Sequence, residues 1–142
     1  MGLDVSERIR RTGMNKTNRM AQPTDDVQTR LKSAMDFMSR EFRRNPRLSE
    51  IAHVAHFSEF HFHRLFRARF GRTPKQVLVD LQIEEVKRLM LAGSRPSDAA
   101  KRAGFSHQSH LTSRFRQRMG VTPRQWMLVA RKRNDAPVEK KR

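Results

Sequence analysis

The stretch that decides the fold is FSEFHFHRLFRARFG, residues 57–71. Its apolar residues recur at helical spacing and predict one buried stripe, made of Phe62, Leu65, Phe66 and Phe70. A second face is aromatic and basic, because four side chains follow one another at i, i+3, i+4 and i+7, namely Phe60, His63, Arg64 and Arg67. Gly71 stands where a helix C-cap is expected. Such a helix suits a nucleic-acid groove, although a surface helix with solvated charges would show the same pattern.

The stretch occurs a second time, as FSHQSHLTSRFRQRMG in residues 105–120. Both copies open with Phe-Ser, close with Phe-Arg-x-Arg-apolar-Gly and continue with Thr-Pro-basic-Gln. Upstream, the serine, acidic and alanine positions of residues 49–55 recur in residues 97–103. The offset is 48 residues up to the Phe-Ser pair and 49 after it, so the second copy has one additional residue near His107. A duplicated unit of this length favours a specific role for the repeated helix over a passive one.

The composition points to a polyanionic partner. The chain has 31 Lys and Arg against 14 Asp and Glu, a formal net charge of +17, and such an excess opposes folding through self-repulsion. Residues 93–131 hold eight basic side chains and one acidic one, so they should supply more of the attraction to phosphate. No apolar run approaches about 18 residues and no secretory segment follows the start, so we expect no membrane partner. The absence of cysteine excludes disulfides and thiolate catalysis and is compatible with the cytoplasm.

Helical periodicity predicts an all-α chain of about seven helices, arranged as two helix-turn-helix subdomains joined by a long linker helix. Residues 1–24 are polar and aperiodic, so we expect a disordered N-terminal extension. Residues 25–92 form the first subdomain with its linker helix, and residues 93–131 form the second. Residues 132–142 are a charged C-terminal tail.

Local signals predict where the first helices begin and end. Thr24 or Asp25 should cap a helix that runs to Arg44. Pro46 should lie in the first turn of a short helix that runs to about Ala55. A turn of three or four residues then leads into the repeated helix, which is the helix-turn-helix arrangement.

The linker helix is expected over residues 74–91. Eighteen residues of α-helix measure about 27 Å, whereas dimeric helix-turn-helix proteins place their reading helices one DNA turn, about 34 Å, apart. Two units in one chain can therefore read two successive major-groove segments without dimerising. We expect a monomer, and an asymmetric DNA site because the two copies differ at their exposed positions.

The exposed faces supply candidate DNA contacts. In the first reading helix Arg64 can donate twice to guanine O6 and N7, and Phe60 can contact a thymine methyl group or else be a buried aromatic. Arg67, Arg69 and Arg72 are expected to contact phosphates, which position the protein without reading bases. In the second reading helix the polar face holds Gln108, Ser109 and Thr112, with Arg116 and Arg118 nearer the DNA backbone. Gln108 can read adenine.

These paired units, with their Phe-Ser turns and Thr-Pro pairs, resemble the DNA-binding domain of the AraC/XylS family over about residues 27–131. The match is close in HFHRLF, residues 61–66, and in GFSHQSH, residues 104–110. The resemblance implies a transcription regulator, in most members an activator, that contacts RNA polymerase. It implies base reading by Phe60, His63 and Arg64, and by Gln108, Ser109, Thr112 and Ser113. The short chain resembles the stand-alone type, similar to the multiple-antibiotic-resistance and superoxide-response activators.

The second unit departs from the family pattern. The family usually has arginine where Ser113 stands and a small apolar residue where Arg114 stands. Arg114 matches Leu65 of the first unit, which we expect in the core. Either the stem of Arg114 is buried while its charge reaches solvent, or the helix is rotated locally.

Other functions fit the sequence less well. His107 and His110 could share a metal, but nothing nearby completes a ligand set, so we expect no metal or other cofactor. No nucleotide-binding loop, nucleophile elbow or converging carboxylate pair indicates an enzyme. The main alternative is a non-specific nucleoid-like or RNA-binding basic protein that uses charge alone. A helical adaptor for an acidic partner is a third reading. A DNA-binding role predicts a cytoplasmic, nucleoid-associated location.

Overall fold

The structure, a computed structural model, describes the backbone of residues 21–135 and the side chains of residues 25–133. Within residues 21–135 the chain forms seven α-helices and one short 3-10 helix, and no strand. In chain order these are α2 (Ala21–Glu41), η1 (Phe42–Arg44), α3 (Leu48–Val54), α4 (Glu59–Phe70), α5 (Pro74–Leu91), α6 (Pro96–Ala103), α7 (Gln108–Met119) and α8 (Pro123–Asp135). The predicted all-α architecture is confirmed, and α5 has the bounds expected for the linker helix.

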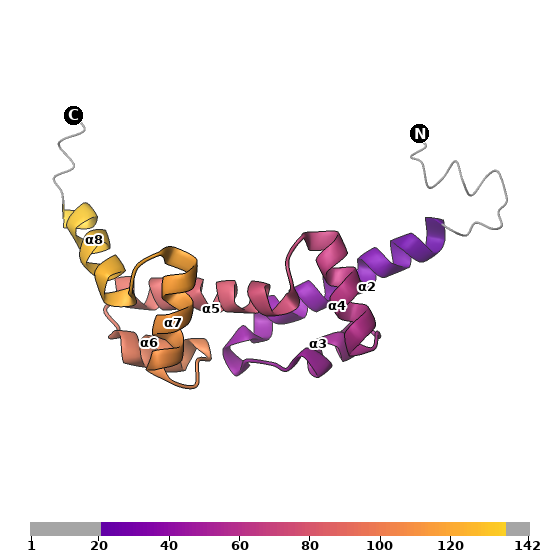
Figure 1. Cartoon of the computed structure of the whole chain (residues 1–142), viewed down its shortest axis with the longest axis horizontal. Helices are drawn as coiled ribbons and strands as arrows, with labels where there is room; N and C mark the ends of the chain where they lie inside the picture. Colours follow the sequence, from indigo (N-terminus) through magenta and orange to yellow (C-terminus); the bar gives the residue numbers. More distant parts are fainter. Residues whose placement is uncertain (1–20, 136–142) are drawn as a thin grey trace, which may run out of the picture.

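The molecule is elongated, with α5 along its middle (Figure 1). Helices α2, α3 and α4 lie around one end of α5, and α6, α7 and α8 lie around the other. Each reading helix follows its predecessor after four residues, since α3 ends at Val54 and α4 begins at Glu59, while α6 ends at Ala103 and α7 begins at Gln108. The chain therefore contains two helix-turn-helix units mounted on one shared helix.

Each unit has its own hydrophobic core, and the two cores use equivalent positions of the repeat. In α4, Phe62 and Phe66 are fully buried, and their ring centroids are 5.4 Å apart. In α7, Leu111 and Phe115 are fully buried in the same positions, and Phe115 lies 6.1 Å from the ring of Trp126. Residues from α5 complete both cores, with Leu78 in the first and Ile83, Val86, Leu89 and Met90 in the second. One helix thus serves two cores, which ties the units together.

The Thr-Pro pairs produce the same cap twice. Thr73 and Gln76 exchange hydrogen bonds of 2.9 and 3.1 Å between side chain and backbone at the start of α5, forming a capping box. Thr122 and Gln125 make the equivalent bonds, also 2.9 and 3.1 Å, at the start of α8. A capping box satisfies backbone N–H groups that the first helical turn leaves unpaired. The repeated motif therefore fixes where each reading unit ends and the next helix starts.

Three predicted boundaries are wrong. Helix α2 begins at Ala21 rather than at Thr24 or Asp25, since proline is tolerated in a first helical turn and Pro23 does not stop it. The α-helix α2 ends at Glu41 and continues as the 3-10 helix η1, so it does not reach Arg44 as an α-helix. Asn45 then adopts a left-handed conformation with φ of 55°, so the chain turns and Pro46 precedes α3 instead of lying in its first turn.

The predicted terminal segments are tested only in part. Residues 21–24, expected to be disordered, belong to α2, and α8 continues through Lys132 to Asp135. Residues 1–20 and 136–142 lie outside the described residues.

The two units contact each other where η1 meets the second helix-turn-helix. Gln82 of α5 is buried, and its Nε2 atom donates to the carbonyl oxygen of Phe42 at 3.2 Å and to Oδ1 of Asn45 at 3.1 Å. Gly104, in the turn before α7, has φ of 106° and packs against this cluster. The side chain of Gln82 therefore links the backbone of the first unit to the turn of the second.

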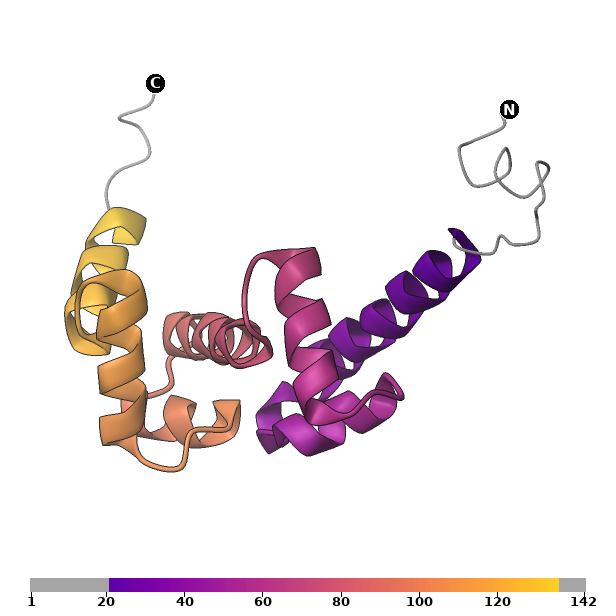
Figure 2. The same ribbon diagram turned by 45° about the vertical axis from the view of Figure 1, so that its right-hand side comes forward.

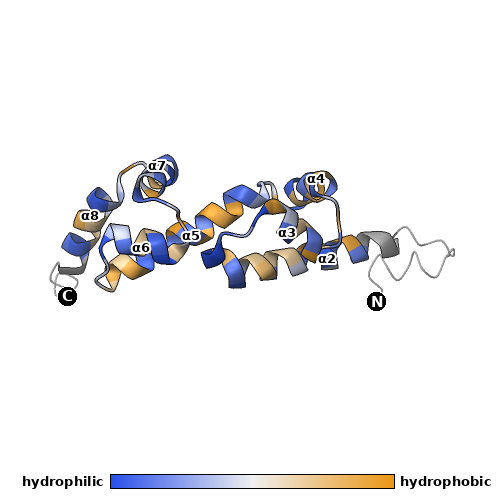
Figure 3. Ribbon diagram, turned by 90° about the horizontal axis from the view of Figure 1, so that it is seen from below, coloured by the Kyte–Doolittle hydropathy of each residue, from blue (hydrophilic) through white to orange (hydrophobic). Residues whose placement is uncertain are grey.

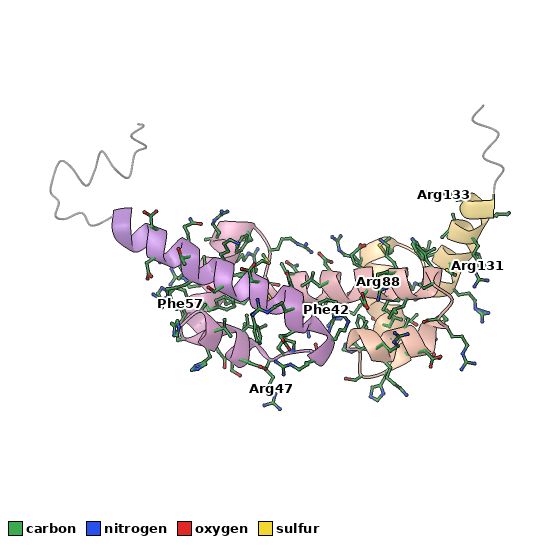
Figure 4. All side chains as sticks on the ribbon, turned by 180° about the vertical axis from the view of Figure 1, so that it is seen from behind. Phe42, Arg47, Phe57, Arg88, Arg131 and Arg133 are labelled. Carbon is green, nitrogen blue, oxygen red and sulfur yellow. The ribbon has the colours of Figure 1, made fainter. Side chains whose placement is uncertain are left out.

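A cluster of ion pairs around Glu85 also stabilises this junction between the two units. Glu85 of α5 is buried and accepts from Arg43 of η1 at 3.1 Å and from Arg88 at 2.7 Å. Hydrogen bonds from Arg88 lower the pKa of Glu85, burial opposes them and Arg43 adds to them, so that the pKa falls from 4.5 to about 2. In Figure 4, seen from behind, Phe42 and Arg88 are labelled on this rear side, at the junction and farther along α5.

Candidate nucleic-acid interface

Helices α4 and α7 lie on the same face of the molecule, one at each end of α5. Figure 1 shows α7 crossing in front of α5 and α4 crossing in front of α2 beside the start of α5, and Figure 2 keeps both helices upright after a turn of 45°. Seen from below in Figure 3, both are viewed nearly end-on along the same side, with α2, α5 and α6 on the other. The two reading helices therefore point their outer faces in a common direction.

The turn before α4 is held by a side chain of α2 that the sequence did not single out. Arg30 donates from Nε to the carbonyl oxygen of Ala55 at 2.8 Å and also hydrogen-bonds the carbonyl of His56. Its guanidinium group lies 3.8 Å from the ring centroid of Phe57. These partners are about 25 residues away along the chain, so no local pattern could have identified them.

The outer face of α4 carries three of its four predicted side chains. Phe60 is 72% exposed, which excludes the buried alternative. Arg64 is exposed, and its guanidinium carbon lies 5.7 Å from the Phe60 ring centroid, so the two side chains form one stacked unit. Arg67 is exposed and makes no hydrogen bond or ion pair with any other side chain that the structure describes.

His63 lies at the edge of the outer face of α4 rather than at its most exposed part. It is half-buried and borders a cavity of about 340 Å³ whose walls come from α3, α4 and the start of α5. Arg47 and Lys75 line the same cavity. His63 therefore shares this cavity with Arg47 and Lys75 and does not lie beside Phe60 alone.

The second reading helix presents a smaller, more polar face. Gln108, Ser109, Ser113 and Arg116 are exposed. Thr112 is half-buried, and its hydroxyl donates to the carbonyl oxygen of Gln108 at 3.1 Å, so its proton is used within the helix. The five predicted side chains of α7 thus lie on one helix, with Thr112 the least accessible.

Several arginines expected at phosphates also bond to side chains within the protein. Arg69 donates to Gln28 of α2 at 2.5 Å. Arg72 forms an ion pair with Oδ2 of Asp80, and Arg118 donates from Nε to Oδ1 at 2.5 Å and from Nη2 to Oδ2 at 3.2 Å. Asp80 therefore connects the turn after α4, the linker helix and the end of α7.

Asp80 was not predicted as a site residue, because its two partners come from different units of the repeat. Partial burial raises the pKa of Asp80, but hydrogen bonds from Arg118 and Arg72 outweigh that effect and hold the pKa below its usual value. The carboxylate stays ionised and holds both guanidinium groups.

Arg114 occupies the position of Leu65 without rotating the helix. Helices α4 and α7 have 12 residues each and bury equivalent pairs of apolar side chains, so the alternative of a local rotation is not observed. Arg114 is half-buried, as is Leu65, and its Nη1 atom lies 3.4 Å from Oε1 of Gln117. Half-burial agrees with the other alternative, in which the charge reaches solvent.

Neither a metal site nor a membrane-spanning helix is found in the described part of the chain. Within the described side chains no group of three or more His, Asp or Glu residues could hold a metal ion. No helix between residues 21 and 135 is both long and apolar enough to cross a membrane.

Comparison with known proteins bears on the family. A helix-turn-helix domain model of the AraC type matches residues 51–128. YbfI, an HTH-type transcriptional regulator of Bacillus subtilis, is 33% identical over 90 residues, which are 63% of this chain and 31% of YbfI. The virulence regulon transcriptional activator VirF of Yersinia enterocolitica is 32% identical over 94 residues, 66% of this chain and 35% of VirF. The chain thus spans about a third of the length of these relatives.

A solved structure with the same fold is the DNA-binding domain of the global transcriptional factor AdpA in complex with a target DNA. It superposes with a TM-score of 0.70 at 23% sequence identity and covers 75% of this chain and 97% of that domain. The family model matches more than half of the chain, and the fold has the same two helix-turn-helix units. The protein belongs to the AraC-type helix-turn-helix family, whose members are transcription regulators.

Proposed function

We propose that this protein is a sequence-specific regulator of transcription that binds double-stranded DNA as a monomer, with α4 and α7 in two successive major-groove segments. One observation carries the proposal, namely that two reading helices with unlike outer faces lie on the same side of a single linker helix. The AdpA domain, which shares the fold, is described in complex with its target DNA. A net charge of +17 supplies the general attraction to phosphate.

Base reading is assigned to the exposed side chains of the two helices. In α4, Arg64 is placed by its stacking on Phe60, and a bidentate contact from Arg64 to guanine would discriminate by about 1–3 kcal/mol. In α7, Gln108 and Ser109 are the exposed side chains at the helix start, where a reading helix meets base edges. Ser113 and Thr112 complete this face, and Arg67 and Arg116 are assigned to phosphates.

The regulatory outcome is proposed to be activation through contact with RNA polymerase, in a cytoplasmic location at the chromosome. Two observations support this proposal, namely membership of the family and the similarity to VirF, a transcriptional activator. No enzymatic step is assigned to the chain.

A second candidate is a non-specific nucleoid-like or RNA-binding protein, which the net charge alone favours. The two candidate functions differ in how the affinity for DNA depends on salt concentration and on DNA sequence. Non-specific binding has a steep salt dependence and little preference among sequences. Specific complexes bind about 10³–10⁷ times more tightly than the same protein binds other DNA.

Selection of bound duplexes from a random pool, followed by competition at fixed salt, tests the proposal. We expect one asymmetric motif with two conserved blocks spaced by about one helical turn. Analytical ultracentrifugation of the protein on a minimal selected duplex should show one chain per DNA. A pool that yields no motif would overturn the specific function, and two chains on a minimal duplex would overturn the monomeric mode.

A further inference from the structure

A cationic cleft lies between the two reading helices and belongs to neither of their outer faces. It has a volume of about 300 Å³ and is formed by the first half of α5, the turn before it and the inner side of α7. Four basic side chains line it, which are Arg72, Lys75, Arg114 and Arg118. Asp80 is the acidic residue in its lining.

The charges of the cleft are not balanced. Asp80 pairs with Arg72 and Arg118, so one negative charge serves two positive ones. Lys75 and Arg114 have no carboxylate partner within the described residues. The cleft therefore carries a formal excess of three positive charges (four minus one) in a confined space. Such an arrangement costs free energy unless an anion enters.

The position of the cleft indicates which anion would bind there. If α4 and α7 occupy successive major-groove segments, the DNA between them turns its minor groove, and the phosphates on either side of it, towards the middle of the protein. In Figure 1 the first half of α5 lies between α4 and α7, which is the part of the chain that forms the cleft.

We propose that this cleft binds backbone phosphates of the DNA segment between the two major-groove contacts, with Lys75 and Arg114 as the contacting cations. The inference rests on the proposed function and adds a third, central contact to it. Gln76 and Gln117 also line the cleft and supply amide donors. Asp80 holds Arg72 and Arg118 at the base of the cleft and leaves the other two cations for the ligand.

The repeat itself supports a special role for Arg114. Its equivalent in the first unit, Leu65, packs against the first core. In the second reading helix this position lines the cleft together with residues of α5, where a cation can reach the central DNA segment. An arginine in place of leucine is costly for a core and useful for a phosphate, because guanidinium pairs well with phosphate oxygens.

Phosphate neutralisation combined with substitution tests the inference. A duplex chosen by selection would carry methylphosphonates at the central backbone positions, and its affinity would be compared with that of the unmodified duplex. The proteins are the wild type, Arg114→Leu, Lys75→Gln and, as the matched control for loss of one charge, Arg131→Gln, an exposed residue of α8 outside the cleft. Thermal unfolding followed by circular dichroism would verify that each variant is folded.

We expect the modified duplex to bind the wild type about tenfold more weakly, the loss of one charged hydrogen bond. Arg114→Leu and Lys75→Gln should each weaken binding to the unmodified duplex and lower the salt slope by about 1. The affinity of these two variants should depend much less on the methylphosphonate than the affinity of the wild type does. Arg131→Gln should keep the full sensitivity.

Different results would overturn the phosphate-binding cleft and the proposed function. A wild-type protein that selects a DNA motif but is indifferent to central methylphosphonates overturns the cleft and leaves the regulator intact. Equal sensitivity in the wild type and in Arg114→Leu and Lys75→Gln does the same. A wild-type protein that selects no DNA sequence overturns the proposed function itself.

Discussion

Gly104 lies directly against the side chain of Gln82, and a Cβ atom added to Gly104 would come within 2.8 Å of Nε2 of Gln82. It would also lie 2.9 Å from the carbonyl oxygen of Arg43 and 3.0 Å from that of Phe42. Contacts this short leave no room for a methyl group, and two of the neighbours are backbone atoms. The glycine therefore lets the turn of the second unit approach η1 of the first, and the contact fixes how the two reading helices are oriented.

Gly104→Ala should lower the free energy of unfolding by about 2–6 kcal/mol, since strain at positive φ and overpacking each cost about 1–3 kcal/mol. Gly93→Ala is the matched control, because Gly93 has a similar φ of 110° but no atom within 4 Å of an added Cβ. Urea unfolding of both variants would isolate the steric part. Equal losses in the two variants would show that the junction is not tightly packed.

Glu85→Gln should lower the free energy of unfolding at pH 7 by about 1–3 kcal/mol, because the buried carboxylate loses its charged hydrogen bonds to Arg43 and Arg88. Since folding holds the pKa of Glu85 at about 2 rather than 4.5, its contribution is complete above pH 4.5. The contribution is then lost as the pH falls towards 2.

Stability measured between pH 7 and pH 2 would therefore fall less steeply in Glu85→Gln than in the wild type. Glu84→Gln is the control, since Glu84 is 69% exposed and, among the described residues, pairs only with Lys87. A wild-type acid profile that Glu85→Gln leaves unchanged would contradict this assignment.

Arg64→Ala and Arg67→Ala should separate base reading from phosphate binding. Arg64→Ala should weaken the selected duplex by about 1–3 kcal/mol and relax the preference at one base pair. Arg67→Ala should weaken all duplexes alike and lower the salt slope by about 1. Binding titrations on the selected duplex and its single-base variants would measure both effects. The assignment of Arg64 fails if its variant keeps every base preference.

Asp80→Asn should increase binding to random DNA and steepen its salt dependence, because Arg72 and Arg118 are released to contact phosphates. Preference for the selected sequence should fall, as α7 loses its ionic link to α5. Asp98→Asn removes the same charge from an exposed residue whose one ion-pair partner in the described part of the chain is Arg95, at 3.6 Å. The effect of this variant would be the baseline. Indistinguishable salt slopes for the two variants would argue against the restraining role of Asp80.

The sequence predicted the elements that local chemistry specifies. The linker helix over Pro74–Leu91 has the expected bounds, because capping residues and glycine stops act within a few residues. The prediction was less accurate at Asn45 and Pro46, where a left-handed residue delays the start of α3. Periodicity alone cannot detect such a residue.

The candidate site was predicted in part for the same reason. Helical spacing correctly placed Phe60, Arg64 and Arg67 on one exposed face of α4. It assigned Arg69, Arg72 and Arg118 to phosphates, whereas they bond to Gln28 and Asp80. Each of these partners belongs to another helix, and spacing within one helix carries no information about it.

By itself, the sequence determined that this protein has two copies of one helix-turn-helix unit, the exposed faces of the repeated helices and their caps, because period and capping are properties of neighbouring residues. Only the tertiary structure decided that both faces point the same way, that Gly104 and Gln82 pack the two units together, and that a cationic cleft lies between them. Those features depend on packing between residues about 20 to 60 positions apart, where side-chain shape and charge are matched across helices rather than along one.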